Sequence, residues 1–410
     1  MKKIVGTIAA IALATSAVFA DVNVGMGFSR GIFTPIAYDG KDARMDISTS
    51  WGAQPRIGGS ISGASEDCGV VGDFKFDGGN LAVNDNAYIW VKPISWLKIN
   101  IGQSFDDTLR GNACFGAWNW LRFGGVGVEV PDPSADPVWG WNLIDPDDPS
   151  QGVDWTATQP TKIESVGSGI MVGEDFIFTR ICDNPLSGAY LPLVGAIIMA
   201  DPIEGLHIGV GLPIAGYENQ KMEDVFTKIQ VQAGYTIDGV GTIKAQWIGA
   251  GKDEDDKVQG QIEAAFDLAA VENMTLAVSA KFRTAKDSPI DVAAFWSMPF
   301  DALRANALVG LTIDSANDAT GLVAGVGIEY DLGNGLGLEA DVRFGKAFIK
   351  DVDTDPSIGF GVYLNKGIAN GTLGIGAEGA IRAGIRDFGP TDAKKEDFVF
   401  ALPIRVQCFF

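Results

Sequence analysis

The sequence lacks any hydrophobic run long enough to form a transmembrane helix. Such a helix needs about 20 consecutive apolar residues, and beyond residue 20 the longest apolar candidate, residues 190–200, is far shorter. Histidine is scarce, with one in 410 residues, and there is no glycine-rich phosphate loop, Cys/His metal spacing or dinucleotide-binding motif. The sequence therefore excludes a helical membrane protein, and we expect neither an enzyme nor a bound cofactor or metal.

Basic residues are in the minority, with 31 lysines and arginines against 52 aspartates and glutamates. Residues 1–20 have the features of a secretory signal peptide: Lys2 and Lys3 precede an apolar stretch, and Ala20 ends a small-residue cleavage site. Its removal takes away two lysines, so the mature chain from Asp21 has 29 basic residues and a net charge of −23. This charge argues against nucleic acid and anionic lipid as partners.

Four cysteines in an exported chain allow three disulfide pairings. Cys114 and Cys182 fall in one long loop and could pair with each other, which leaves Cys68 over. Cys408 lies on the apolar stripe of the last strand, where we expect a thiol that faces lipid. The pairing among Cys68, Cys114 and Cys182 stays open.

The last strand has an apolar residue at every second position. These residues are Phe398, Phe400, Leu402, Ile404, Val406, Cys408 and Phe410. The positions between them include Arg405 and Gln407, so one face is apolar and the other is polar. Such a strand suits a barrel with lipid outside and water inside, although a half-buried strand of a soluble sandwich has the same pattern. Pro403 removes a hydrogen bond from the ladder, and we expect a β-bulge there.

From Tyr88 onward the chain repeats strands of about ten residues with alternating polarity. Two kinds of break separate these strands in strict alternation. The short breaks are residues 93–96, 201–205, 238–240, 270–273, 299–302, 331–335 and 365–371. The longer, acidic breaks include residues 251–257, 314–319, 350–357 and 387–397. Short turns at one rim and long loops at the other are typical of outer-membrane barrels.

The sequence thus predicts an all-β fold, a single transmembrane antiparallel β-barrel of residues 21–410 with short periplasmic turns and long acidic extracellular loops. Counting from Tyr88 gives fifteen strands, and residues 22–30, 44–51 and 56–62 supply three more. The preferred count is 18, and 16 is the close alternative. A barrel of this size is too wide for its own side chains to fill.

Alternation also assigns each strand residue to the lipid or to the lumen. The outward positions, Ile243, Val278, Val326 and Val342 among them, carry no charge, while the inward positions hold ten basic and seven acidic residues. The residues expected to line the pore and set its charge selectivity are Lys98, Lys244, Arg304, Arg343, Arg382, Arg405, Glu339, Asp341 and Glu378. Charges at a narrow waist are screened less by salt than charges on exposed loops. The slightly basic wall therefore predicts weak anion preference at high salt and a drift toward cations at low salt. The single histidine, His207, is expected to be a polar lumen residue.

Residues 105–187 form one exceptionally long connection. It contains five tryptophans, which are Trp118, Trp120, Trp139, Trp141 and Trp155. So many tryptophans are unusual in a solvated loop. The loop is therefore expected either to fold into the barrel and narrow the pore, or to pack over the mouth and contact a partner.

With these features the chain resembles the outer-membrane β-barrel porins of bacteria with two membranes, and among them the porin-like proteins of the spirochaete outer sheath. The resemblance rests on residues 1–20, the terminal strand 398–410 and the hairpins between them. It implies insertion by the barrel-assembly machinery, which in this family reads a terminal phenylalanine, here Phe410. It also implies passive diffusion of small hydrophilic solutes through a water-filled pore.

The expected function is therefore that of a porin in the outer membrane of a diderm bacterium, with outer-membrane lipid, the assembly machinery and small hydrophilic solutes as partners. The alternative is a surface-exposed adhesin that acts through the long Trp-rich loop. A channel for fatty acids or other apolar solutes would need an apolar path, which the inward positions do not provide. Solute selectivity and the choice between a monomer and a homo-oligomer such as a trimer stay open.

Overall fold

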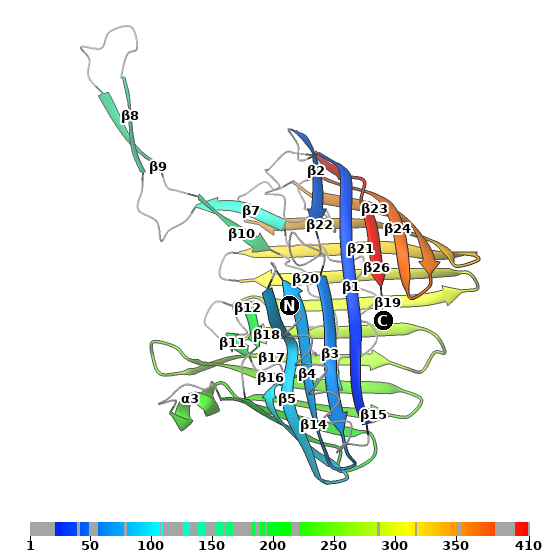
Figure 1. Cartoon of the computed structure of the whole chain (residues 1–410). Coiled ribbons are helices and arrows are strands. Elements are labelled where there is room, and N and C mark those ends of the chain that lie inside the picture. The colour runs from blue at the N-terminus through cyan, green and yellow to red at the C-terminus, as the bar shows by residue number, and fades with distance from the viewer. Residues whose placement is uncertain are drawn as a thin grey trace.

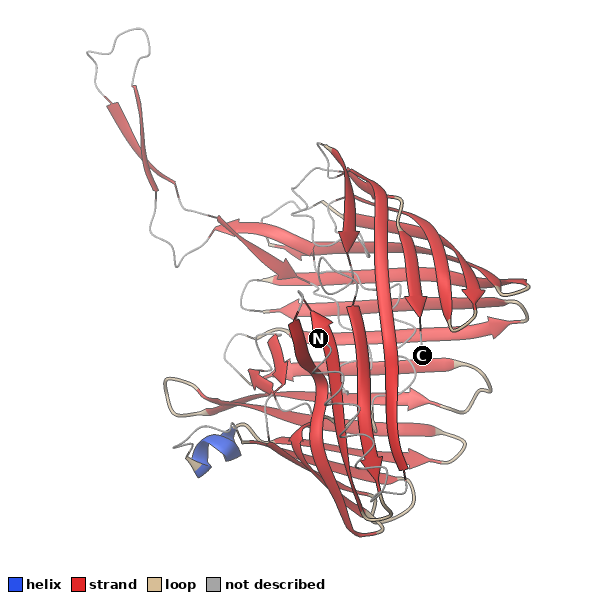
Figure 2. Cartoon of the chain, viewed as in Figure 1, coloured by secondary structure: helices blue, strands red, loops and turns tan. Residues whose placement is uncertain are grey.

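The computed structural model consists almost entirely of antiparallel β-strands (Figure 1 and Figure 2). It describes residues 21–38, 42–48, 56–77, 80–106, 108–109, 126–131, 138–143, 153–158, 161–166, 182–184, 189–192, 195–214, 221–284, 288–315, 318–350, 355–381 and 398–408. The helix α3 (Met222–Thr227) has six residues. Over the described ranges, no helix has the length and apolar character needed to cross a membrane.

Twenty strand segments form the main sheet. In chain order they are β1 (Asp21–Tyr38), β2 (Ala43–Ser48), β3 (Arg56–Ala64), β4 (Cys68–Asp77), β5 (Asn80–Ile94), β6 (Leu97–Gln103), β13 (Gly195–Ala200), β14 (Leu206–Pro213), β15 (Gln230–Ile237), β16 (Gly241–Lys252), β17 (Val258–Leu268), β18 (Thr275–Arg283), β19 (Ile290–Phe300), β20 (Leu303–Asp314), β21 (Ala319–Gly333), β22 (Leu336–Ile349), β23 (Ser357–Ile368), β24 (Gly371–Ile381), β25 (Phe398–Ala401) and β26 (Ile404–Cys408). Their pairings are antiparallel, β6 pairs with β13 across the long connection, and β1 pairs with β25 and β26. The sheet therefore closes on itself as a barrel.

Two pairs of segments share one place each in the wall. β2 and β3 pair with successive stretches of β1, and β25 and β26 pair with successive stretches of β24. The main sheet contains 20 strand segments. When each of these two pairs is counted as one strand, the wall has 18 strands. Agreement with the predicted count of 18 depends on whether these pairs are counted as one strand or two, so the strand number stays a prediction.

The strands before Tyr88 differ from the prediction. Residues 44–51 and 56–62 were expected to be two neighbouring strands, but β2 and β3 follow one another along β1. The prediction also missed β4, which pairs with β3 and β5. β4 does not alternate cleanly, because Val70 and Val71 are adjacent and Gly69 and Gly72 interrupt the pattern.

The last wall strand is interrupted at Pro403, but the extra residue expected there lies in β1. The register of β24 against the last strand is the same before and after the break. Along β1 the register shifts between Thr34 and Ala37, a stretch that contains Pro35. Both prolines lack the N–H that a ladder needs, so the ladder is irregular at this height. The N–H of Leu402 still donates to the carbonyl of Ile36, and the N–H of Gly376 to the carbonyl of Pro403. The prediction of a bulge at Pro403 was wrong in its position.

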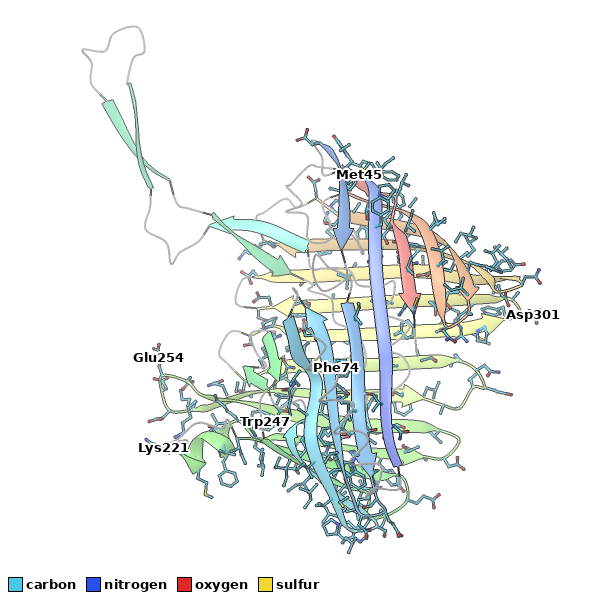
Figure 3. All side chains as sticks on the ribbon, in the orientation of Figure 1. Met45, Phe74, Lys221, Trp247, Glu254 and Asp301 are labelled. Carbon is cyan, nitrogen blue, oxygen red and sulfur yellow. The ribbon has the colours of Figure 1, made fainter. Side chains whose placement is uncertain are left out.

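Short turns and longer connections alternate around the barrel, as predicted. Several short turns contain a residue with positive φ, among them Asn273, Asp301, Asn334 and Asn370, and asparagine and aspartate tolerate that conformation better than most residues. Figure 3 places Asp301 at one end of the barrel and Lys221 and Glu254 at the other. The two sets overlap in length. Two, five and four residues separate β4 from β5, β16 from β17 and β20 from β21 at the long-loop rim, whereas six separate β17 from β18 at the short-turn rim.

The two faces of the wall are opposite in character to those of a soluble protein. Outward apolar side chains are exposed, with Val326 at 60% and Ile243 at 54%. Charged side chains at inward positions are buried, among them Lys244, Glu263 and Arg343. Soluble proteins almost never bury such residues unless they are paired, whereas a membrane barrel presents apolar residues to lipid and polar residues to its lumen. The wall is therefore a membrane-spanning barrel with an apolar outer belt.

The long connection between β6 and β13 contains three further hairpins. β7 (Val126–Pro131) pairs with β10 (Thr161–Val166), β8 (Val138–Leu143) with β9 (Val153–Thr158), and β11 (Cys182–Asn184) with β12 (Ala189–Pro192). β7 contacts β22 and β10 contacts β21, while β8 and β9 stand away from the barrel (Figure 1). Cys114 lies outside the described residues, so its pairing with Cys182 stays a prediction, and Cys68 and Cys408 are free thiols.

Candidate functional site

The start of the long connection turns back and lies against the inner wall of the barrel. Residues 104–106 and 108–109, which we name the inner strap, follow directly after β6. Oδ2 of Asp106 accepts a hydrogen bond from Nε2 of Gln232 at 2.6 Å and lies 2.7 Å from Nε2 of His207. Both partners are buried and inward-facing, on β15 and β14. Asp106 therefore ties the strap to two neighbouring strands.

Lys244 of β16 makes a second tie between the strap and the wall. Its Nζ donates to the carbonyl oxygen of Leu109 at 2.7 Å and to Oδ2 of Asp267 at 2.6 Å. The side chain of Lys244 is 1% exposed, and a buried ammonium needs such partners because it has lost its water. Removing the strap would leave this ammonium with one of these two acceptors.

Two glycines make room for the strap on the inner wall. A Cβ atom at Gly209 would lie 2.6 Å from Oδ2 of Asp106, and a Cβ atom at Gly234 would lie 2.3 Å from Cδ2 of Leu109. Any larger residue at either position would push the strap away from β14 and β15. The wall is thus shaped to receive Asp106 and Leu109, and this close approach explains glycine at these inward positions.

His207 lies between two carboxylates. Its Nδ1 is 2.8 Å from Oδ1 of Asp201 in the short turn, and its Nε2 is 2.7 Å from Oδ2 of Asp106. Asp201 is 65% exposed, whereas Asp106 is 1% exposed, so the histidine connects the rim to the buried strap. Because carboxylates engage both ring nitrogens, neither is left to activate a nucleophile. His207 has the surroundings expected of a polar lumen residue, and the absence of enzymatic activity stays a prediction.

Opposing causes set the pKa of Asp106, which lies outside the membrane-spanning strands. Burial raises the pKa of this carboxyl, but the hydrogen bond and charge of His207 and the hydrogen bonds from Thr108 together hold it below its usual 3.8. A carboxylate with a lowered pKa stabilises the folded state above its ordinary pKa. That contribution is lost as the pH falls through the lowered value.

We expect the inner strap to stay on the wall from neutral pH down to about pH 4, and to leave it only in stronger acid. Hydrogen-exchange mass spectrometry, corrected for the intrinsic exchange rate at each pH, measures the protection of the strap amides. Asp106→Ala is the control, because without this carboxylate the strap should lack protection throughout. Loss of protection well above pH 4 in the native chain would contradict the role given to Asp106.

Arg405 of β26 is the centre of a second polar cluster on the inner wall. Its guanidinium carbon lies 3.4 Å from the ring centroid of Tyr363, and its Nη2 lies 3.5 Å from Oε2 of Glu339. Asn365 donates to the same Glu339 oxygen at 3.1 Å. The hydroxyl of the fully buried Tyr363 donates to Glu378. The side chain of Arg405 is 14% exposed, so this charge is held by neighbours and still meets the lumen.

Three of the predicted selectivity residues, Arg405, Glu339 and Glu378, come together in this cluster. Arg343 and Asp341 form a separate pair on β22, with Nε and Oδ1 2.8 Å apart and each side chain 1% exposed. Because both side chains are this deeply buried, the pair belongs to the wall and does not meet a solute.

The remaining predicted selectivity residues are spread around the barrel. Arg304 donates to Ser297 at 3.1 Å, Lys98 lies 5.4 Å from the ring centroid of Trp90, and Lys244 holds the strap. Arg382 and the assembly residue Phe410 lie outside the described residues. The assignment of these side chains to charge selectivity stays a prediction.

Sequence reasoning named Lys244 and His207 as lumen residues, but it did not predict that they hold a strap, and it missed Asp106 and Gln232. Asp106 follows a strand end like many loop carboxylates, and its partners His207 and Gln232 are 101 and 126 residues away in the chain. The available signal was glycine at inward positions 209 and 234, where a close approach of another segment is one explanation.

A closed antiparallel wall with an apolar outer belt and a polar inner face defines an outer-membrane β-barrel, and the chain belongs in the outer membrane of a diderm bacterium. OccK1 (OpdK) of Pseudomonas aeruginosa superposes with a TM-score of 0.51 at 11% identity, over 95% of this chain and 98% of that chain. OmpT of Vibrio cholerae gives a TM-score of 0.47 at 12% identity, over 95% and 97%. A refined porin structure gives 0.43 at 10% identity, over 94% and 100%.

At these identities the similarity concerns the fold alone, and the superposition on OccK1 is the one that supports it. No family model and no curated protein matches the chain. The expected resemblance to spirochaete porins is not tested by structures from Pseudomonas and Vibrio and stays a prediction.

Proposed function

We propose that the chain is an outer-membrane porin through which small hydrophilic solutes diffuse passively. The observation that carries the proposal is the inner wall, where polar and charged side chains point into a closed barrel whose outside is apolar. The side chains of Arg405 and Glu339 are each 14% exposed, so charge on this wall still meets the lumen. A passage for water and polar solutes needs such a wall.

The inner strap supports a pore with a defined width. Asp106 and Leu109 hold the strap against β14, β15 and β16, inside the barrel and close to the short turns. A segment fixed at this place narrows the passage toward the short-turn rim, which we take to be the periplasmic side. Small solutes should therefore pass more readily than large ones.

Liposome swelling tests this proposal. Vesicles that contain the refolded protein are placed in isotonic solutions of arabinose, glucose, sucrose and raffinose. We expect swelling with the monosaccharides and progressively slower swelling with the larger sugars. Vesicles with correctly folded protein that do not swell in arabinose would refute passive diffusion.

Replacing Arg405 by glutamate should shift the selectivity of the pore toward cations. The new carboxylate would lie beside Glu339 and reverse the charge at a position that still meets the lumen. The shift should be larger at low salt, where screening is weaker. Reversal potentials across a KCl gradient measure it, with Arg405→Lys as the matched control that keeps the charge. Equal reversal potentials for the native protein and both variants would mean that Arg405 does not contribute to charge selectivity.

The proposal includes insertion into outer-membrane lipid by the barrel-assembly machinery, with Phe410 as the recognised terminal residue. Deleting Phe410 should lower the amount of protein in the outer membrane and leave the conductance of each inserted channel unchanged. Quantitative immunoblots of outer-membrane fractions measure the amount. An unchanged amount with a lower single-channel conductance would assign Phe410 to the pore instead.

A surface adhesin is the second candidate, and one observation favours it. The hairpin of β8 and β9 stands away from the barrel (Figure 1), and Trp141 and Trp155 are register partners within it. A projecting hairpin of this kind can reach another molecule. Deleting residues 115–179 should then abolish binding of host-matrix proteins and leave conductance intact, whereas unchanged binding would exclude this loop as the adhesive element.

A further inference from the structure

A cavity of about 440 Å³ lies between the inner strap and the short-turn rim. Leu109 of the strap, Glu204 of the turn between β13 and β14, and Asp267 of β17 line it together with His207. Its volume is in the range of cavities that hold small-molecule ligands. None of the roles argued above for these residues uses the space between them.

Carboxylates dominate the charged groups around this cavity. Asp201, Glu204 and Asp267 line it, and among its described lining residues His207 alone can carry a positive charge. Lys244 holds Oδ2 of Asp267 at 2.6 Å and is tied at the same time to the strap. Oδ1 of Asp267 is buried and accepts no hydrogen bond from the described residues. The cavity therefore has an excess of negative charge.

The remaining lining offers aliphatic surface and hydroxyl groups. Leu109 and Ile203 supply the aliphatic surface. The hydroxyls of Thr236 and Thr242 lie 3.0 Å apart and can exchange hydrogen bonds with a polar group. Carboxylates beside short aliphatic side chains fit a ligand that combines an ammonium group with a few methylene groups.

We propose that this cavity is a binding site for small aliphatic amines. The inference rests on the proposed pore and adds to it the class of solute that is held near the short-turn rim. The ammonium group meets the carboxylates of Glu204 and Asp267, and the methylene groups cover Leu109. A dicarboxylate of the same length meets like charges and is repelled.

Planar-bilayer recordings with putrescine and succinate, a dication and a dianion with four-carbon chains, test the proposal. Each compound is added to either side in turn after the ligand-free current has been recorded. We expect putrescine to interrupt the current, more strongly from the side of the short turns, and succinate to leave it unchanged. Glu204→Gln, a change at an exposed turn residue, should weaken the apparent affinity for putrescine about tenfold.

Asp301→Asn is the matched control, because Asp301 is an exposed carboxylate in another short turn and does not line the cavity. It should leave the putrescine block unchanged. Equal block by succinate and putrescine would overturn the proposal. So would a putrescine block that persists unaltered in both Glu204→Gln and Asp267→Asn.

The same recordings separate this inference from the pore itself. A folded protein with no ligand-free current would refute the pore. Calorimetric titration of putrescine into the refolded barrel then tests the cavity alone. Binding that weakens in Glu204→Gln and persists in Asp301→Asn supports the site, and no binding overturns it.

Discussion

Replacing Asp106 by alanine should raise the single-channel conductance of the barrel and the noise of its open current. The change removes the acceptor that joins the inner strap to His207 and Gln232. A hydrogen bond to a charged group contributes about 1.5–3 kcal/mol, so losing both costs about 3 kcal/mol or more. Because 1.4 kcal/mol corresponds to a tenfold change in an equilibrium constant, the fraction of time that the strap spends off the wall should rise about a hundredfold.

Thr108→Val is the control for this experiment. Thr108 donates to Oδ1 of Asp106 within the strap, whereas the contacts with the wall use Oδ2. Conductance should therefore change little in this variant. If Asp106→Ala folds and its conductance and noise equal those of the native chain, the strap does not narrow the pore.

Replacing Val326 by lysine should destabilise the barrel by about 2–4 kcal/mol, the cost of a lysine on the lipid face at mid-bilayer. Val326 is the middle residue of β21, faces outward and is 60% exposed. Guanidinium unfolding of the protein in lipid vesicles, followed by tryptophan fluorescence, measures the difference.

The matched control for this change is Tyr330→Lys, four residues along the same strand toward the short-turn rim. Tyr330 also faces outward, at 41% exposure, and near the interface a lysine costs about 0–1 kcal/mol. Equal effects at the two positions would mean that depth does not matter. The outer face of β21 would then not lie in a bilayer.

The barrel class could be predicted from the sequence because alternation is a local property. Val326, Ile328 and Tyr330 stand on one face of a strand whatever its neighbours are, and their exposure in the structure agrees with the lipid-facing assignment. Turn residues such as Asn334 and Asn370 are also local signals, and they mark the short-turn rim where the structure has it.

Features that depend on distant pairings could not be predicted in the same way. β2 and β3 have the periodicity of two strands, but they share one place because both pair with β1. The bulge near Pro35 depends on the register against β2. The contact of Asp106 with His207 needs the barrel to be closed before the two residues meet.

Single-channel recording from the purified, refolded protein in planar bilayers tests the central claim most directly. The closed wall, its polar inner face and its apolar belt together predict a water-filled passage through the membrane. We expect discrete, uniform conductance steps as single barrels insert. Protein with the circular dichroism of a folded β-barrel that inserts into the bilayer without any conductance step would contradict the account.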